Sequence, residues 1–168
     1  MIRKGTFDDA AQMADIFNYY IANSTAIFSN RLRSADDMRG LLAPVVGNYP
    51  FFVSEDDGLL TGYCFAHAYM PDPVYSATWE ITIYLRHGHT GRGTGSALLH
   101  SIIDEARRQG AHTLISCVTG GNEACSRMHL KAGFRLAGTL KQAGYKFGQF
   151  LDDELYQLIL NKAAGADV

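Results

Sequence analysis

The sequence predicts an α/β fold, in which strands and helices are mixed along the chain around a central strand-turn-helix unit. Segments with strand and helix periodicity follow one another along the 168 residues, without repeats or low-complexity tracts. A strand, a glycine-rich turn and a helix occupy the middle of the chain. The composition, 47% apolar and 19% charged, is that of an ordinary globular domain with a hydrophobic core. We therefore expect a single domain over residues 1–162 and a frayed tail over residues 163–168.

The first half of the chain carries clear start and stop signals. Residues 2–4 form a short strand, and Thr6 with Asp8 and Asp9 gives the first helix an N-cap and an acidic first turn. Asn23-Ser24-Thr25 ends that helix. A second helix begins at Ser34 and ends before Gly47. The strands over residues 51–55 and 59–68 are joined by Asp56-Asp57-Gly58, a hairpin signal.

The second half alternates strands and helices. A loop around Met70-Pro71-Asp72-Pro73 precedes a strand over residues 77–85, and Gly110 ends the helix that follows the glycine-rich turn. The remaining predicted elements are a helix over 96–108, a strand over 112–118, a helix over 123–131, and strands over 133–140 and 155–160.

The turn Gly91-Arg92-Gly93-Thr94-Gly95-Ser96 indicates an anion site. Glycines let the backbone approach a phosphate, and the first N–H groups of the following helix point at it. The turn lacks the Gly-Lys-Ser/Thr of a Walker loop, and its glycine spacing differs from that of dinucleotide folds. We interpret it as a pyrophosphate site for a phosphorylated cofactor; the alternative is a glycine-rich turn before a surface helix.

Charge and cysteine content exclude several classes. The net charge is −2, which argues against a general nucleic-acid binder. The three cysteines form no C-x-x-C pair, and the six histidines show no H-x-x-x-H spacing, so we predict no metal site. The N-terminus has no apolar signal core, and no apolar run approaches the roughly 20 residues that span a bilayer. We expect a cytoplasmic protein with neither a membrane nor a nucleic acid as partner.

Four segments resemble motifs of one family, in that family's order. Residues 78–85, Thr-Trp-Glu-Ile-Thr-Ile-Tyr-Leu, are similar to a T-x-E-x-S-V-Y-V strand, and Gly91 to Gly95 to an R-G-x-G turn. A third motif of the family has Asn, Ser, His and Gly-Phe in that order, and the matching residues here are Asn122, Ser126, His129 and Gly133-Phe134. Residues 144–152 are similar to G-x-K-F-G-x-W-L-D. The chain therefore resembles the GNAT superfamily of N-acetyltransferases, and within it the phosphinothricin and methionine sulfone group.

The resemblance implies a fold and an activity. The fold is a mixed, mostly antiparallel, twisted sheet of about six to seven strands flanked by about four helices, with acetyl-CoA in a cleft after the central strand. The activity is transfer of the acetyl group of acetyl-CoA to the primary amine of a small amino-acid-like substrate. A homodimer is implied as well.

Glu80 and His129 are the candidate catalytic residues. Glu80 is a lone carboxylate among apolar strand neighbours, which suits a general base that deprotonates an ammonium; the alternative is a solvated strand carboxylate. By resemblance, His129 occupies the position of the acid that protonates the leaving thiolate. Its alternative is a structural histidine.

The resemblance also assigns cofactor contacts. Ile83, Tyr84 and Leu85 would pair with the pantetheine arm, and the Leu85 N–H would polarise the thioester carbonyl. The pyrophosphate would be held by Gly91, Arg92, Gly93, Thr94, Gly95 and Ser96. Asn122 and Ser126 would bind near the pantetheine, although Asn122 also suits a helix N-cap.

Departures from the group's pattern concern the acceptor. Asp72 stands where the group often has an arginine that neutralises a substrate carboxylate, Ile81 replaces a polar residue, and Thr90 replaces an arginine or glutamine. The candidate substrate residues are Phe28, Asp72, Tyr75, Glu80, Ile81 and Thr82. An acidic residue at position 72 keeps open a cationic amine, a protein N-terminus or a lysine as acceptor. A non-catalytic acyl-CoA sensor is the remaining alternative.

Overall fold

The computed structural model describes residues 1–160, so the predicted tail over residues 163–168 lies outside the described residues. Seven strands form one sheet in the order β1-β2-β3-β4-β5-β7-β6. The strands are β1 (Ile2–Lys4), β2 (Phe51–Asp56), β3 (Leu59–Ala68), β4 (Thr78–Leu85), β5 (Thr113–Thr119), β6 (Arg135–Lys146) and β7 (Gln149–Ile159). All neighbouring pairs are antiparallel except β4 and β5. The predicted mixed, mostly antiparallel sheet is confirmed.

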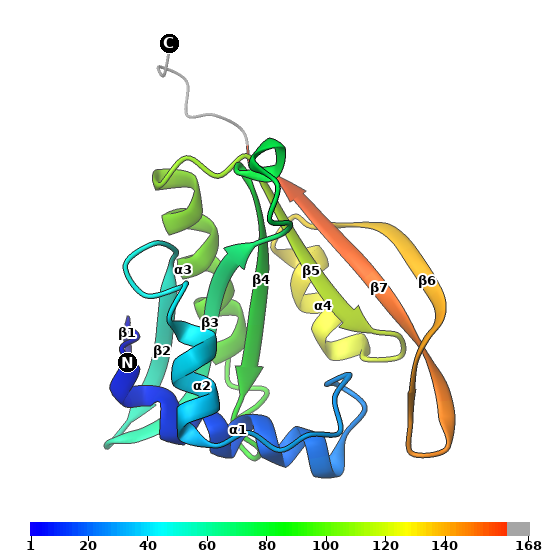
Figure 1. Cartoon of the computed structure of the whole chain (residues 1–168), viewed down its shortest axis with the longest axis horizontal. Coiled ribbons are helices and arrows are strands. Elements are labelled where there is room, and N and C mark those ends of the chain that lie inside the picture. The colour runs from blue at the N-terminus through cyan, green and yellow to red at the C-terminus, as the bar shows by residue number, and fades with distance from the viewer. Residues whose placement is uncertain (161–168) are drawn as a thin grey trace.

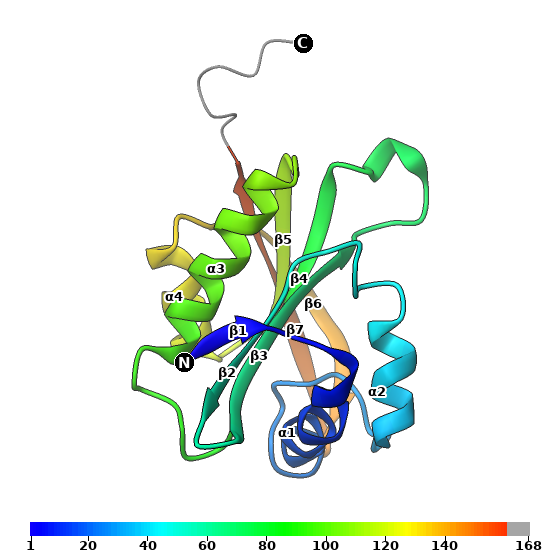
Figure 2. The ribbon, with the colours of Figure 1, turned by 90° about the vertical axis from the view of Figure 1, so that its left-hand side faces the viewer.

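Four α-helices cover the two faces of the sheet, as predicted. Figure 2 shows α3 and α4 on one side and α1 and α2 on the other. The helices are α1 (Ala10–Asn23), α2 (Ala35–Leu42), α3 (Thr94–Arg108) and α4 (Glu123–Lys131), and short 3₁₀ turns span Phe7–Asp9 and Pro73–Tyr75. Each face has its own apolar core. One core lies under α1 and α2, and the other lies between α3 and the central strands.

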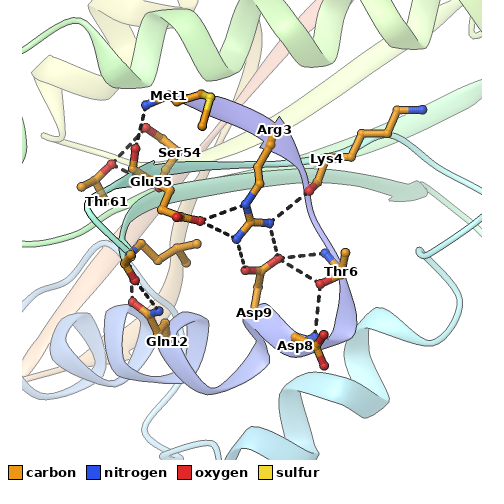
Figure 3. A network of polar contacts seen from close by, with 12 residues as sticks. Met1, Arg3, Lys4, Thr6, Asp8, Asp9, Gln12, Ser54, Glu55 and Thr61 are labelled. Carbon is orange, nitrogen blue, oxygen red and sulfur yellow. Dashed lines mark hydrogen bonds and ion pairs between the residues drawn. The ribbon is translucent and has the colours of Figure 1, made fainter.

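The N-terminal segment is fixed by a polar network (Figure 3). The Arg3 guanidinium donates to both carboxylate oxygens of Asp9, at 3.0 and 2.7 Å, and to Oε2 of Glu55 at 2.9 and 2.7 Å. Asp9 also completes a capping box with Thr6 at the start of the first helical turn. The network therefore joins β1, β2 and the beginning of α1.

The parallel pair β4 and β5 stays together over only three residues. Thr78 to Glu80 pair with Thr113 to Ile115, and beyond Glu80 the two strands have no further partners in common. Figure 1 shows β4 and β5 diverging toward the ends to which both arrows point. The second half of β4 therefore has one backbone edge without a strand partner.

The hairpin of β6 and β7 corrects the sequence prediction. Strands were expected over 133–140 and 155–160, but pairing continues to Lys146 and Gln149 at the hairpin tip. The tip is a two-residue turn with positive φ at Phe147 (50°) and Gly148 (76°). Phenylalanine is rare in that conformation, and two register shifts interrupt the alternation of side chains, so the usual hairpin signals are missing.

Two smaller boundaries also differ. The helix expected from Ser96 begins at Thr94, since Gly93 (φ 82°) serves as its N-cap. The second helix ends at Leu42, and turns continue the chain toward Gly47. Within residues 1–160, none of the helices is both long and apolar enough to cross a bilayer.

Candidate active site

A cavity of about 770 Å³ occupies the space where β4 and β5 separate. A cavity of this size suits a large cofactor or a cofactor together with a substrate. It is lined by residues 80–85 of β4, residues 116–122 at and after the end of β5, Thr90, Gly91, Gly93, Gly95 and Ser96, Ala124, Cys125 and Met128 of α4, and Tyr20 with residues 24–26. The cavity thus brings together segments from both halves of the chain.

The free edge of β4 points into this space. The Arg86 N–H donates to Thr61 O on β3 at 2.8 Å. Because successive residues of a strand direct their backbone groups to opposite sides, the N–H and C=O of Leu85 point away from β3. The Tyr20 hydroxyl donates to Leu85 O at 2.8 Å, which agrees with this direction. Ile83 and Leu85 therefore turn their backbone groups toward the cavity, whereas the backbone groups of Tyr84 face β3, so Tyr84 does not offer the backbone contact that the resemblance implied.

The glycine turn forms one end of the cavity. Gly91 and Gly93 both have positive φ, and a Cβ on Gly95 would lie 2.9 Å from the sulfur of Met128. Gly91, Gly93, Gly95 and Ser96 line the cavity, whereas the side chains of Arg92 and Thr94 do not. Thr94 is the first residue of α3, so its N–H belongs to the free amides of that helix start. The arrangement suits an anion held by backbone N–H groups.

Glu80 lies at the point where the strands part, beside other acidic groups. Burial and then the charge of Glu80 raise the pKa of the Cys117 thiol on β5 to about 12. The same two causes raise the pKa of Asp153 on β7. Glu80 pairs with Ile115, two residues before Cys117, and Asp153 pairs with Thr119, so the side chains of Glu80, Cys117 and Asp153 lie on the same face of the sheet. An ammonium group would be attracted to this position, and Glu80 could accept its proton.

His129 is placed differently from the predicted proton donor. Its side chain is fully buried, packs edge-on against Phe134 and lies outside the cavity lining. Nδ1 donates to Cys125 O at 2.9 Å, which leaves Nε2 as an acceptor, buried without a partner. Burial lowers the pKa of His129, so the ring is held neutral. These contacts are those of a structural histidine.

The α4 residues divide between the cavity and the sheet. Asn122 lines the cavity and caps α4, since its side-chain oxygen accepts from the Cys125 N–H at 3.3 Å. Ser126 instead donates to Oε2 of Glu154 at 3.3 Å and does not line the cavity. Cys125, which the sequence analysis did not select, takes the position facing the cavity.

The candidate acceptor residues are not all brought together. Ile81 and Thr82 line the cavity with Glu80, but Phe28 packs near Gly144 outside it. Asp72 is exposed and accepts from the Val74 N–H at 2.9 Å, where it caps a short 3₁₀ turn. Tyr75 packs on Tyr69 in that same loop, also outside the lining.

One wall of the cavity was not found by sequence reasoning. Residues 24–26 form that wall, and Lys146 of β6 holds it in place. The buried Lys146 ammonium donates to the carbonyl oxygens of Ser24 (2.7 Å), Ile27 (3.0 Å) and Tyr20 (3.3 Å). Thr119 adds a hydrogen bond to Thr25 O at 2.9 Å. The only sequence signal for Lys146 was its place in the 144–152 motif.

Comparisons with known proteins show which family the chain is similar to. The profile of the family described as "Acetyltransferase (GNAT) domain" matches residues 2–155. An L-methionine sulfoximine/L-methionine sulfone acetyltransferase of Salmonella typhimurium is 33% identical over 95% of this chain and 94% of its own length. A phosphinothricin N-acetyltransferase of Streptomyces coelicolor is 30% identical over 93% of this chain and 94% of its own.

A solved structure shows the same fold with a ligand. It is a phosphinothricin acetyltransferase of the GNAT superfamily from Sinorhizobium meliloti in complex with acetyl-CoA. It is 27% identical to this chain. The superposition covers 99% of this chain and 91% of the solved chain, with a TM-score of 0.93.

Proposed function

This chain belongs to the GNAT family of acetyltransferases, and from that premise we propose that it moves the acetyl group of acetyl-CoA to the primary amine of a small amino-acid-like substrate. The enzyme class follows from the family and from relatives named as N-acetyltransferases. The substrate class is supported by relatives named for phosphinothricin and for methionine sulfoximine or sulfone.

The cavity fits acetyl-CoA as co-substrate, which supplies the acetyl group as an activated thioester. The unpaired edge at Ile83 to Leu85 would pair with an extended pantetheine arm, as an added strand pairs with a sheet edge. The glycine turn and the first amides of α3 would hold the pyrophosphate. The Leu85 N–H would bond the thioester carbonyl oxygen and stabilise the negative charge that develops there.

Glu80 acts as the general base in this proposal. It takes one proton from the acceptor ammonium, and the neutral amine attacks the thioester carbonyl carbon. The new C–N bond forms and the C–S bond breaks when the tetrahedral intermediate collapses. The second proton of the attacking nitrogen goes to the departing thiolate, directly or through water. His129 is left out of this step because its Nδ1–H is bonded to the Cys125 carbonyl.

Two further properties belong to the proposal. The chain would work as a homodimer, which the exposed aromatic side chains at the hairpin tip support: Tyr145, Phe147 and Phe150 are each about 60% exposed. The three cysteines are all free, which supports a reducing compartment such as the cytoplasm.

The observation that carries the proposal is the position of Glu80 in the cavity, and Glu80→Gln tests it. We expect kcat to fall by about 10²- to 10⁴-fold, because the glutamine cannot accept the proton. The affinity for acetyl-CoA, measured by calorimetry, should stay within about twofold, because the thioester is held by backbone groups. Activity is measured as release of CoA thiol with phosphinothricin, methionine sulfone, polyamines and short peptides as acceptors.

Asp153→Asn is the comparison variant, since it removes the neighbouring carboxylate and leaves Glu80 in place. We expect it to lower kcat less than Glu80→Gln does. Equal loss in both variants would contradict the assignment of the base to Glu80. Turnover only with polyamines or peptides would mean that the acceptor is a cationic amine or a protein amine and not an amino-acid-like substrate. Acetyl-CoA binding without turnover on any amine would favour a non-catalytic acyl-CoA sensor.

A further inference from the structure

A second cavity, of about 310 Å³, lies on the face of the sheet that α1 and α2 cover (Figure 2). Its floor is formed by two cross-strand pairs of β3 and β4. Tyr63 pairs with Tyr84, and the next pair on the same face is Phe65 with Thr82. The helices α1 and α2 and the turn after α2 form the other walls, with Phe17, Met38, Leu41, Pro44 and Val45, and His67 completes the lining.

The two cavities meet at β4, because Thr82 and Tyr84 line both of them. Alternate side chains of a strand share one face of the sheet, so both residues point to the side of α1 and α2, where Tyr84 packs against the core. The free backbone edge at Ile83 and Leu85, where the thioester would lie, flanks Tyr84 on either side. A group that extends from the thioester on this face therefore meets Thr82 and Tyr84 first.

The lining of the smaller cavity suits an uncharged aliphatic chain. Within residues 1–160, no Asp, Glu, Lys or Arg lines it. Met38, Val45 and Tyr63 are each about 1% exposed, and burial raises the pKa of Tyr63 and of Tyr84, so both hydroxyls stay neutral. An apolar chain would gain free energy by leaving water here, whereas a charged group would lose its hydration without finding a partner.

The acceptor is the other candidate occupant, but the groups proposed to receive its amine lie elsewhere. Glu80 and Cys117 line the larger cavity and not the smaller one. The acetyl group, for its part, has a single methyl beyond the carbonyl carbon, so it leaves most of the 310 Å³ unused. A donor with a longer acyl group would use that space, because its chain begins where the two cavities meet.

We propose that the enzyme also accepts acyl-CoA donors whose unbranched apolar acyl group is longer than acetyl, and that the smaller cavity holds this chain. The inference rests on the proposed function and extends it on the donor side. The transfer itself is unchanged: the amine nitrogen bonds to the acyl carbon, the C–S bond breaks, and CoA leaves as the thiol. The product is then an amine that carries the longer acyl group.

Calorimetry without an acceptor compares the binding of acetyl-CoA, butanoyl-CoA and hexanoyl-CoA. We expect butanoyl-CoA to bind about tenfold more tightly than acetyl-CoA, because two more methylene groups leave water. Leu41→Phe fills the cavity from α2, so it should remove this advantage and leave the affinity for acetyl-CoA within about threefold. Leu41→Ala enlarges the cavity and should shift the preference toward hexanoyl-CoA. With L-methionine sulfone as the fixed acceptor, kcat/KM measured by release of CoA thiol should follow the same order.

Val46→Phe is the matched control, because Val46 is half-buried against the same core as Leu41 but does not line the cavity. It should leave the donor preference unchanged. Equal affinities for the three donors, or an advantage of the longer donors that survives Leu41→Phe, would overturn the proposal. A rise in KM for the acceptor in Leu41→Phe, with acetyl-CoA as donor, would also overturn it and assign the cavity to the acceptor.

Failure of the proposed function has a different signature. In that case the unmodified protein would bind the three donors and transfer none of their acyl groups to any amine. The order of the three affinities, and its loss in Leu41→Phe, would still decide whether the smaller cavity holds the acyl chain.

Discussion

Two thiols face the cavity, and their ionisation decides whether they take part in the chemistry. Burial raises the pKa of Cys125 to about 11, and burial together with the charge of Glu80 raises that of Cys117 to about 12. A thiol becomes a good nucleophile only as the thiolate, so neither cysteine is activated near neutral pH. The environment of these residues therefore favours direct attack by the amine over an acetyl-cysteine intermediate.

His129 should contribute to the pH dependence of the free energy of unfolding. Burial lowers the pKa of His129 below its ordinary value of 6.5, so in the window just below pH 6.5 the unfolded chain binds a proton that the folded chain does not. The free energy of unfolding should therefore fall as the pH is lowered from 7 to about 5. We expect His129→Phe to flatten this dependence, measured by urea unfolding at several pH values.

His100→Phe is the control for that measurement, since His100 is exposed on α3. It should keep the slope of the unmodified protein. The window ends near pH 5 because carboxylates begin to contribute at lower pH. Hydrogen bonds from Arg3 and Thr6 hold the pKa of Asp9 below its ordinary value although burial opposes them, and hydrogen bonds from Lys141 and Gln142 lower the pKa of Asp152. An equal slope in His129→Phe would contradict the neutral, buried state of His129.

Local sequence patterns identify most of the helices and strands, but they do not predict that β4 and β5 separate after three paired residues. Alternation over residues 77–85 and the glycines after it predict a strand, a turn and a helix, and β4 and α3 follow closely. The separation of β4 from β5 depends on pairing between residues about 35 positions apart, which leaves no local pattern. The β6–β7 hairpin was underestimated for a related reason, since register shifts break its alternation.

The glycine turn can be tested as an element with a pair of alanine substitutions. Gly93 and Gly88 have nearly the same positive φ, 82° and 80°, and a Cβ on either would meet open space. Each alanine should cost about 1–2 kcal/mol of stability through backbone strain. Only Gly93 lines the cavity, so only Gly93→Ala should raise KM for acetyl-CoA, by about tenfold for each 1.4 kcal/mol of binding lost.

Steady-state kinetics with acetyl-CoA as the varied substrate, alongside thermal unfolding of both variants, checks this. Gly88→Ala serves as the control for strain alone. A comparable rise in KM in both variants would mean that distortion of the turn, and not its contact with the cavity, controls binding.

At the scale of the whole molecule, the sequence predicts the family and the helix and sheet layers of the fold. Which side chains meet at the cavity depends on tertiary contacts. The order of motifs led to Glu80, the β4 edge and the glycine turn, all of which line the cavity. Lys146 was not selected, because it acquires its place through hydrogen bonds to a distant segment of the chain. Asp72 and Tyr75 were selected from motif position, yet their loop carries them away from the lining.

Lys146 joins β6 to the end of α1 and the segment after it, and its removal should lower the stability of the fold and weaken acetyl-CoA binding in the cavity. Its ammonium satisfies carbonyl oxygens of residues 20, 24 and 27, more than a hundred positions away in sequence. Lys146→Met leaves these groups unpaired, so we expect a loss of about 1–3 kcal/mol in the free energy of unfolding. Because residues 24–26 line the cavity, KM for acetyl-CoA should rise as well.

Lys141→Met is the matched control, because Lys141 lies on the same strand with its side chain 75% exposed and pairs with Asp152 at 2.8 Å. An exposed pair contributes little, so that variant should lose less than about 1 kcal/mol and keep its KM. Urea unfolding and acetyl-CoA kinetics on both variants separate the two effects. If Lys146→Met lost stability without a change in KM, the ammonium would support the fold while the cavity wall held its shape through Thr119. If it lost neither, the three hydrogen bonds would be dispensable and the wall would be held by packing alone.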